Sequence, residues 1–145
     1  MNRFRLNILI TIFFFSTCGI IYSQNNDENS VKSTLKNILD YSKAKSYDKA
    51  AVLIAYNGDD KSKIGVDTFN PADKDDMVQV KRICKKISAL IDISDKYSVS
   101  KIDAVKIEDK TGYKVLVIFT SGNQELETDF EFIKLAKGYA LLNVN

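Results

Sequence analysis

Histidine is absent from the 145-residue chain, and cysteine occurs only twice, at Cys18 and Cys84. Without histidine the chain has neither a Ser-His-Asp nor a Cys-His catalytic group, and it cannot bind zinc through imidazole. Two cysteines are too few for a thiolate zinc cluster. The chain also contains no glycine-rich phosphate loop, dinucleotide-binding fingerprint or twelve-residue calcium loop. We therefore predict no metal site, no cofactor and no catalytic residue, which favours a protein without enzymatic activity.

Charge is almost absent from residues 1–23, where Arg3 and Arg5 precede an uncharged apolar run over residues 6–22. A positive start followed by an apolar stretch is typical of a secretory signal peptide. The run is slightly shorter than the roughly 18–20 apolar residues that span a bilayer, and small and polar residues interrupt it. Cleavage after Ser23 is therefore favoured over a retained membrane anchor and predicts an exported protein, either periplasmic or secreted.

Cys18 offers a second way of processing this segment. Residues 15–18 resemble a lipoprotein box, in which Cys18 is lipidated and anchors the protein to a membrane. The apolar residues 20–22 that follow differ from a polar lipoprotein tether, so cleavage after Ser23 is the preferred interpretation. Such cleavage leaves Cys84 as the only cysteine, which excludes an internal disulfide and predicts a buried thiol on a helix.

No excess of one charge remains after this cleavage. Two of the 21 Lys and Arg residues lie in the signal segment, so the rest of the chain balances its 19 Asp and Glu residues. Because nucleic-acid binding needs a net positive field, no nucleic-acid partner is predicted. Residues 24–30 are polar and are expected to form a flexible tether. Residues 31–145 are expected to form a single domain around one core.

Apolar residues at helical spacing predict helices over residues 31–45, 46–54 and 71–91. Ser30 and Asn70 are the expected caps of the first and third helices. The third helix carries a basic arc, formed by Lys81, Arg82, Lys85 and Lys86. We interpret this arc as solvated surface in preference to a site for an anionic partner. The acids near its start, Asp59, Asp60, Asp73, Asp75 and Asp76, match no oxygen-ligand loop and are interpreted in the same way.

After Asp95 the apolar period changes from near four to two, which predicts strands. The strands are expected over residues 97–108, 113–120, 124–134 and 139–144. Consecutive strands with short turns form an antiparallel meander. The predicted fold class is therefore α+β, with N-terminal helices packed on one face of a curved four-stranded antiparallel sheet.

A two-residue turn at Ser121 and Gly122 predicts the register of the middle hairpin, with Val117 opposite Leu126. One face of this hairpin is then apolar: Tyr113, Val115, Val117, Phe119, Leu126, Phe130 and Phe132. A slip by one residue would bury the carboxylates of the strand at residues 124–134. The assignment of residues to the two faces is therefore strongly preferred.

Two segments resemble a known superfamily. The sequence ILDYSKAKSYDKAAVLI is similar to the opening helices of nuclear transport factor 2-like domains, and YKVLVIFTSGNQELETDFEFIKLAKGYALLNV is similar to their closing hairpins. This superfamily of α+β cones is also described as cystatin-like, and the resemblance implies a small exported bacterial protein. In such folds the sheet wraps round the helices, and the pocket that often remains serves catalysis, binding or dimerisation in different members.

The resemblance, together with the apolar face, points to a pocket between helices and sheet. Its candidate lining residues are Tyr113, Val115, Phe119, Phe130, Phe132 and Asp48. The leading hypothesis is a non-catalytic module that binds a small apolar ligand or a protein partner. An alternative is a small isomerase-like or lyase-like enzyme, in which Asp48 moves a proton and Tyr113 steadies an enolate.

A third hypothesis is a structural envelope protein that forms a homodimer. Leu116 and Ile118 lie on the outer face of the predicted sheet, among acids of the neighbouring strand. Apolar residues with a polar rim can mark an interface, so these two residues are the interface candidates. The sequence leaves these three functions open.

Overall fold

The computed structural model describes residues 26–107 and 109–145. The predicted signal segment, its cleavage site and the cysteine within it lie outside these residues. Helix α1, described over residues 26–43, is followed by the short α2 (Tyr47–Ala51) and the longer α3 (Lys74–Asp92). The helices therefore precede all the strands, as predicted.

The strands of the sheet are β1 (Lys96–Ile107), β2 (Lys110–Ser121), β3 (Gln124–Leu135) and β4 (Gly138–Val144). They pair antiparallel in the order β1-β2-β3-β4. The predicted α+β class and the four-stranded meander are confirmed.

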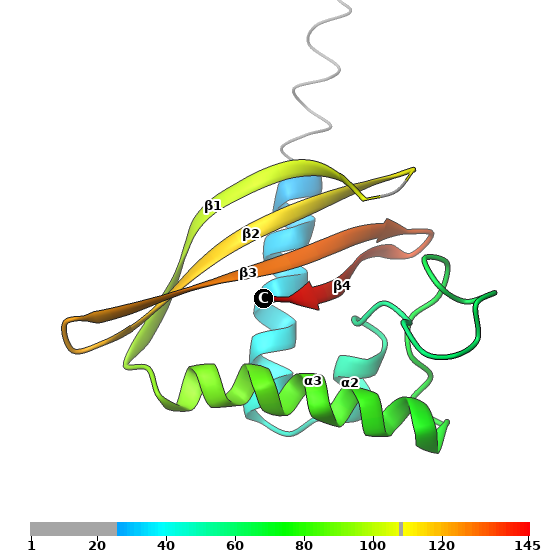
Figure 1. Ribbon diagram of the computed structural model, residues 1–145, viewed down its shortest axis with the longest axis horizontal. Coiled ribbons are helices and arrows are strands. Elements are labelled where there is room, and N and C mark those ends of the chain that lie inside the picture. Colours follow the sequence, from blue (N-terminus) through cyan, green and yellow to red (C-terminus); the bar gives the residue numbers. More distant parts are fainter. Residues whose placement is uncertain (1–25, 108) are drawn as a thin grey trace, which may run out of the picture.

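The sheet bends over the helices, with α1 running behind the strands and α3 crossing the open side below them (Figure 1). The apolar stripes of the helices and the inner face of the sheet form one core. Helix α1 contributes Val31, Leu35, Ile38 and Leu39, and α3 contributes Val80, Cys84 and Ile87. Each of these side chains is at most 1% exposed. The predicted burial of the thiol is therefore confirmed.

The turn between β2 and β3 differs from the predicted one. Gly122 and Asn123 form it, so Val117 pairs with Thr128 and not with Leu126. Gly122 has a φ of 56°, which suits the first central residue of a two-residue hairpin turn. The register is thus shifted by two residues. Because side chains alternate with a period of two, every residue stays on its predicted face.

The boundaries of α1 and α2 differ from those expected. Helix α1 already includes residues 26–30, where the sequence predicts a tether and a cap at Ser30. Asp27 in this turn forms an ion pair with Lys134 of β3 at 3.1 Å, which joins the start of α1 to the sheet. Helix α2 ends before residue 54, because the backbone of residues 53–55 pairs with Leu141 of β4.

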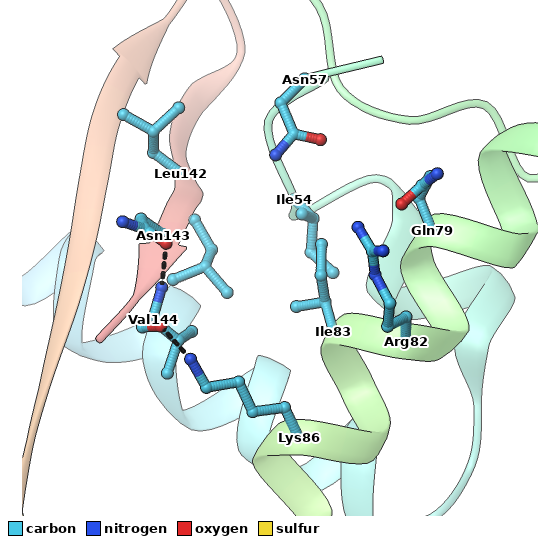
Figure 2. A pocket seen from close by; sticks show the side chains of 10 residues that line it. Ile54, Asn57, Gln79, Arg82, Ile83, Lys86, Leu142, Asn143 and Val144 are labelled. Atoms are coloured by element: carbon cyan, nitrogen blue, oxygen red, sulfur yellow. Dashed lines mark hydrogen bonds between the residues drawn. The ribbon is translucent and has the colours of Figure 1, made fainter.

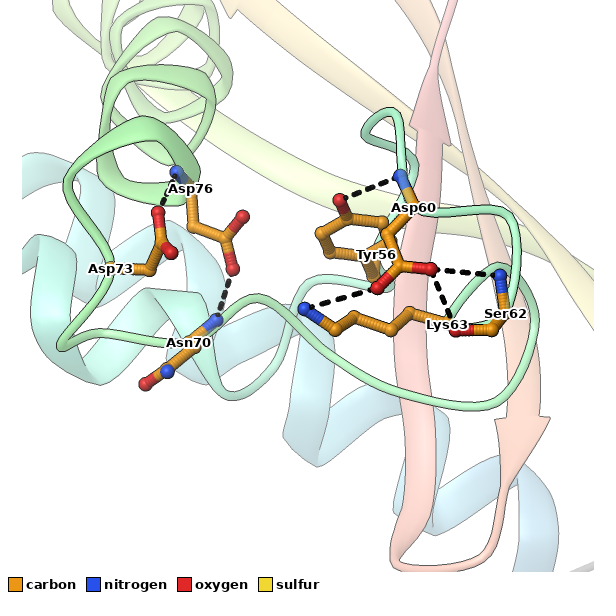
Figure 3. A network of polar contacts seen from close by, with 7 residues as sticks. All are labelled: Tyr56, Asp60, Ser62, Lys63, Asn70, Asp73 and Asp76. Carbon is orange, nitrogen blue, oxygen red and sulfur yellow. Dashed lines mark hydrogen bonds and ion pairs between the residues drawn. The ribbon is translucent and has the colours of Figure 1, made fainter.

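The N-cap of α3 is Asp73 and not the predicted Asn70 (Figure 3). The Oδ1 atom of Asp73 accepts hydrogen bonds from the backbone N–H groups of Asp75 and Asp76, at 2.9 and 3.0 Å. Asn70 closes the preceding turn instead, since its Oδ1 accepts from the N–H of Ala72 at 3.0 Å. Asp73 has the extended backbone of a cap and directly precedes the first helical residue, so its carboxylate is the one within reach.

The loop before α3 is organised around Tyr56 and Asp60 (Figure 3). The Tyr56 hydroxyl accepts a hydrogen bond from the Asp60 N–H at 3.1 Å. The Asp60 carboxylate accepts from the Ser62 hydroxyl at 2.6 Å, and this bond holds the pKa of Asp60 below its usual value. Lys63 pairs with Asp60 at 3.5 Å. Asp60, Asp73 and Asp76 are thus engaged in local contacts, and no three metal-ligating side chains converge among the described residues.

Candidate functional site

The apolar pocket candidates of β2 and β3 form part of the core. They are at most 3% exposed and lie in one cluster with side chains of all three described helices: Tyr113, Val115, Phe119, Phe130 and Phe132. The ring centres of Phe119 and Phe130 are 6.4 Å apart. These side chains therefore fill the space in which the sequence predicts a pocket, and other residues line the cavities described below. Asp48 lies exposed in the first turn of α2.

The polar surroundings of Tyr113 come from β3, β4 and the start of α1. The ring of Tyr139 meets that of Tyr113 edge-on, with 5.4 Å between the ring centres. Lys134 forms its ion pair with Asp27, and its Nζ lies 5.5 Å from the centre of the Tyr139 ring. Burial, and then the charge of Asp27, raise the pKa of both phenols. The carboxylates near Tyr113 are thus those of Asp27 and Glu28, in a segment that the sequence predicts to be a tether, and Lys134 neutralises that of Asp27.

A cavity of about 310 Å³ lies between α3 and β4 (Figure 2). Its apolar lining residues are Ile54, Ile83, Leu141, Leu142 and Val144. Its polar lining residues are Asn57, Gln79, Arg82, Lys86 and Asn143. Figure 2 shows Ile54 and Ile83 on the α3 side of the opening, facing Leu142, Asn143 and Val144 across it. We call this site the α3–β4 cavity.

Helix periodicity explains how α3 contributes to the cavity. Gln79, Arg82, Ile83 and Lys86 recur at spacings of three and four residues, so they share one side of the helix. The neighbouring stripe, with Val80 and Ile87, is buried in the core. The α3–β4 cavity is thus bounded by the edge of the apolar stripe and by the start of the polar face.

Two cations lie at the rim of the α3–β4 cavity. Lys86 donates a hydrogen bond from its ammonium group to the backbone carbonyl of Val144, which ties α3 to β4. Arg82 lies one turn earlier and forms no ion pair with any residue that the structure describes. Lys81 and Lys85, which belong to the same basic arc, do not line the cavity. The arc is therefore divided between the rim of a cavity and open surface.

The amine of Lys86 is the one group among the described lining residues that could act as a base or nucleophile, and it donates a hydrogen bond to the Val144 carbonyl. Among the described lining residues there is no carboxylate, hydroxyl or thiol side chain. The polar groups are amides and cations, which donate hydrogen bonds to an anion. Sequence reasoning missed the cavity because no local pattern indicates that Ile83 and Leu142 face each other.

Two other cavities have less uniform linings. One of about 260 Å³ lies beside the β3–β4 turn, where the opposite charges of Asp67 and Lys137 both contribute. Another of about 400 Å³ lies between α1 and β1, where Glu28 lies among Lys32 and Lys101. Neither combines an apolar floor with charges of one sign.

The interface candidates on the outer face are half-buried. Leu116 and Ile118 lie beside the ion pair of Lys114 and Asp129, whose charged atoms are 2.8 Å apart. More exposed apolar side chains lie on the opposite face of the same strands, where Tyr97 and Leu126 pair with Phe119 and Val99 pairs with Val117, and these three are 39–45% exposed.

Comparisons with protein-family models, with curated proteins and with solved structures gave no significant match. Among the helices of the described residues, none has the length and apolar character needed to cross a membrane.

Proposed function

We propose that the chain is a non-catalytic binding module that takes a small ligand into the α3–β4 cavity. The observation that carries the proposal is the composition of the lining, with an apolar floor, a rim of amides and cations, and no carboxylate, hydroxyl or thiol among the described lining residues. Apolar pockets with a few convergent polar groups are typical of ligand sites. Proton transfer would require an acid or base within reach of the ligand, and the one candidate among the described lining residues, the amine of Lys86, is engaged with the Val144 carbonyl.

The proposal is tested by blocking the cavity. Ile83→Trp should fill it, whereas Val78→Trp places the same side chain on an exposed part of α3, where Val78 is 62% exposed and does not line the cavity. We expect small amphipathic compounds from a fragment set to shift the amide resonances of Gln79 and Asn143 in the unchanged chain and in Val78→Trp. Ile83→Trp should abolish these shifts. Its melting temperature should equal that of Val78→Trp, which would show that both variants fold. Shifts that survive in Ile83→Trp would contradict the proposal.

We also propose that the protein is exported and that it is a member of the nuclear transport factor 2-like superfamily. The positive and apolar segment over residues 1–23 supports export. The order of helices followed by an antiparallel meander supports the superfamily. Mass spectrometry of the processed protein should find Gln24 as its first residue. A diacylglycerol adduct on Cys18 would show lipid anchoring instead.

A further inference from the structure

We infer that the ligand of the α3–β4 cavity is an amphipathic carboxylate, a small molecule with one carboxylate head and one short apolar body. This inference rests on the proposed function and names the chemical class of its ligand. The head would bind at Arg82 and Lys86, and the body would lie against Ile83 and Leu142.

The charge of the rim selects an anionic head. Arg82 and Lys86 are four residues apart on α3, so their charged groups reach the same side of the opening. No lining residue among those described is acidic, so a bound anion would meet no like charge there. The planar guanidinium of Arg82 has paired donors that match the two oxygens of a carboxylate. Asn57 and Gln79 supply further N–H donors at the same rim.

The floor of the cavity selects an apolar body. Ile83 and Leu142 line the cavity and are half-buried, so they present apolar surface to it, whereas Ile54 and Val144 are only 1% and 6% exposed. The volume of about 310 Å³ is at the small end for ligand pockets, which leaves room for one short chain or ring. Each methylene buried there should tighten binding by roughly fourfold.

The test uses octanoate as the probe, titrated calorimetrically into the full processed chain. Three further probes separate the contributions: octan-1-ol has the body without the charge, butanoate has a shorter body, and inorganic phosphate has charge without a body. We expect octanoate to bind most tightly. Butanoate should be weaker by roughly fourfold for each methylene that it lacks inside the cavity.

A matched pair of variants tests the head. Arg82→Gln removes the charge at the rim, whereas Lys85→Gln removes a neighbouring exposed charge that does not line the cavity. We expect Arg82→Gln to weaken octanoate binding by about tenfold or more and to leave octan-1-ol unchanged. Lys85→Gln should change either affinity by less than about twofold. Both residues are exposed, and equal melting temperatures would show that both variants fold.

The outcomes distinguish this inference from the proposed function. If octan-1-ol binds as tightly as octanoate, or if Arg82→Gln does not weaken octanoate binding, the carboxylate class is wrong. Loss of octan-1-ol binding in Ile83→Trp would in that case still support the cavity as a ligand site. If octanoate binds Ile83→Trp as tightly as it binds the unchanged chain, the ligand does not bind in the α3–β4 cavity, and both proposals are wrong. Failure of octanoate to bind overturns the carboxylate class by itself, and phosphate binding alone would overturn it in favour of an inorganic anion.

Discussion

The Asp76 carboxylate accepts a hydrogen bond from the backbone N–H of Asn70 at 2.8 Å, although only 9% of Asp76 is exposed (Figure 3). The backbone N–H of Asp76 is itself held by Asp73, the cap of α3. Asn70 directly follows Phe69, which is buried in the core. This contact therefore fixes the loop that ends at Phe69 to the first turn of the helix that forms one wall of the α3–β4 cavity.

Asp76→Ala should lower the free energy of unfolding by about 1–3 kcal/mol, because it leaves the Asn70 N–H without its acceptor in a partly buried place. Asp75→Ala is the matched control, since Asp75 lies exposed in the same helical turn. The control should change stability by less than about 1 kcal/mol through the helix dipole alone. Urea unfolding of both variants measures the difference, and equal midpoints would contradict a role for the Asn70 contact.

Gly112→Ala should destabilise the sheet. A Cβ atom at this position would lie 2.6 Å from the backbone oxygen of Phe132 and 2.7 Å from Cδ1 of Ile107. The Phe132 oxygen belongs to the neighbouring strand and cannot move away without disturbing its pairing. We expect the free energy of unfolding to fall by about 1–3 kcal/mol, as it does at other overpacked sites. Thr111→Ala on the same strand is the control, and thermal melts in which Gly112→Ala equals it would refute the steric argument.

Tyr139→Phe should make the protein more resistant to alkaline unfolding. Burial raises the pKa of Tyr139, so the folded state holds the phenolic proton more tightly than the unfolded state does. The stability linked to this group is present below the unfolded pKa of about 10 and is lost as the pH rises above it. The melting temperature of the unchanged chain should therefore fall more steeply above pH 10 than that of the variant.

Tyr97→Phe is the control for this experiment, because Tyr97 is 40% exposed. Its pH profile should follow that of the unchanged chain. Near neutral pH, Tyr139→Phe should be nearly neutral, within about 1 kcal/mol, because the Tyr139 hydroxyl has no hydrogen-bond partner among the described residues. Identical alkaline profiles for the unchanged chain and Tyr139→Phe would show that this phenol is not responsible.

Cys84 should resist alkylation in the folded protein. The residue is 0% exposed, and burial raises the pKa of its thiol, which lowers the fraction of reactive thiolate. Iodoacetamide should label the processed chain only in denaturant. Ala89→Cys, an exposed position on the same helix, should gain one rapidly labelled thiol without denaturant. Rapid native labelling of Cys84 itself would contradict the packing of α3 against the sheet.

The sequence predicted the strands well because their signal is local. The predicted strand starts at residues 97, 113, 124 and 139 lie within three residues of those in the structure. The alternation of Phe130 and Phe132 with acidic neighbours also identified the buried face correctly. The turn was misplaced by one residue because Gly122 suits either position of a tight turn, and local residues do not distinguish the two pairings.

Local sequence patterns did not predict whether the space between the helices and the sheet is an open pocket. Phe130 and Phe132 were correctly assigned to the face that the helices cover, yet the pattern does not reveal whether the space between the layers is open. In the structure the side chains of α1 reach the sheet and fill that space. Whether a layer is packed or hollow depends on the summed volume of side chains from several elements, which no single element's period encodes.

The amino-acid sequence by itself determined the absence of histidine chemistry, the change of apolar period near Asp95 and hence the α+β class, since each depends on residue types or on neighbours a few positions apart. Only the tertiary structure decided where a ligand site lies. The α3–β4 cavity exists because Lys86 and Val144, 58 residues apart, meet at its edge. That meeting depends on the path of the whole sheet, so tertiary packing and not local patterning turns part of a basic helix face into the rim of a pocket.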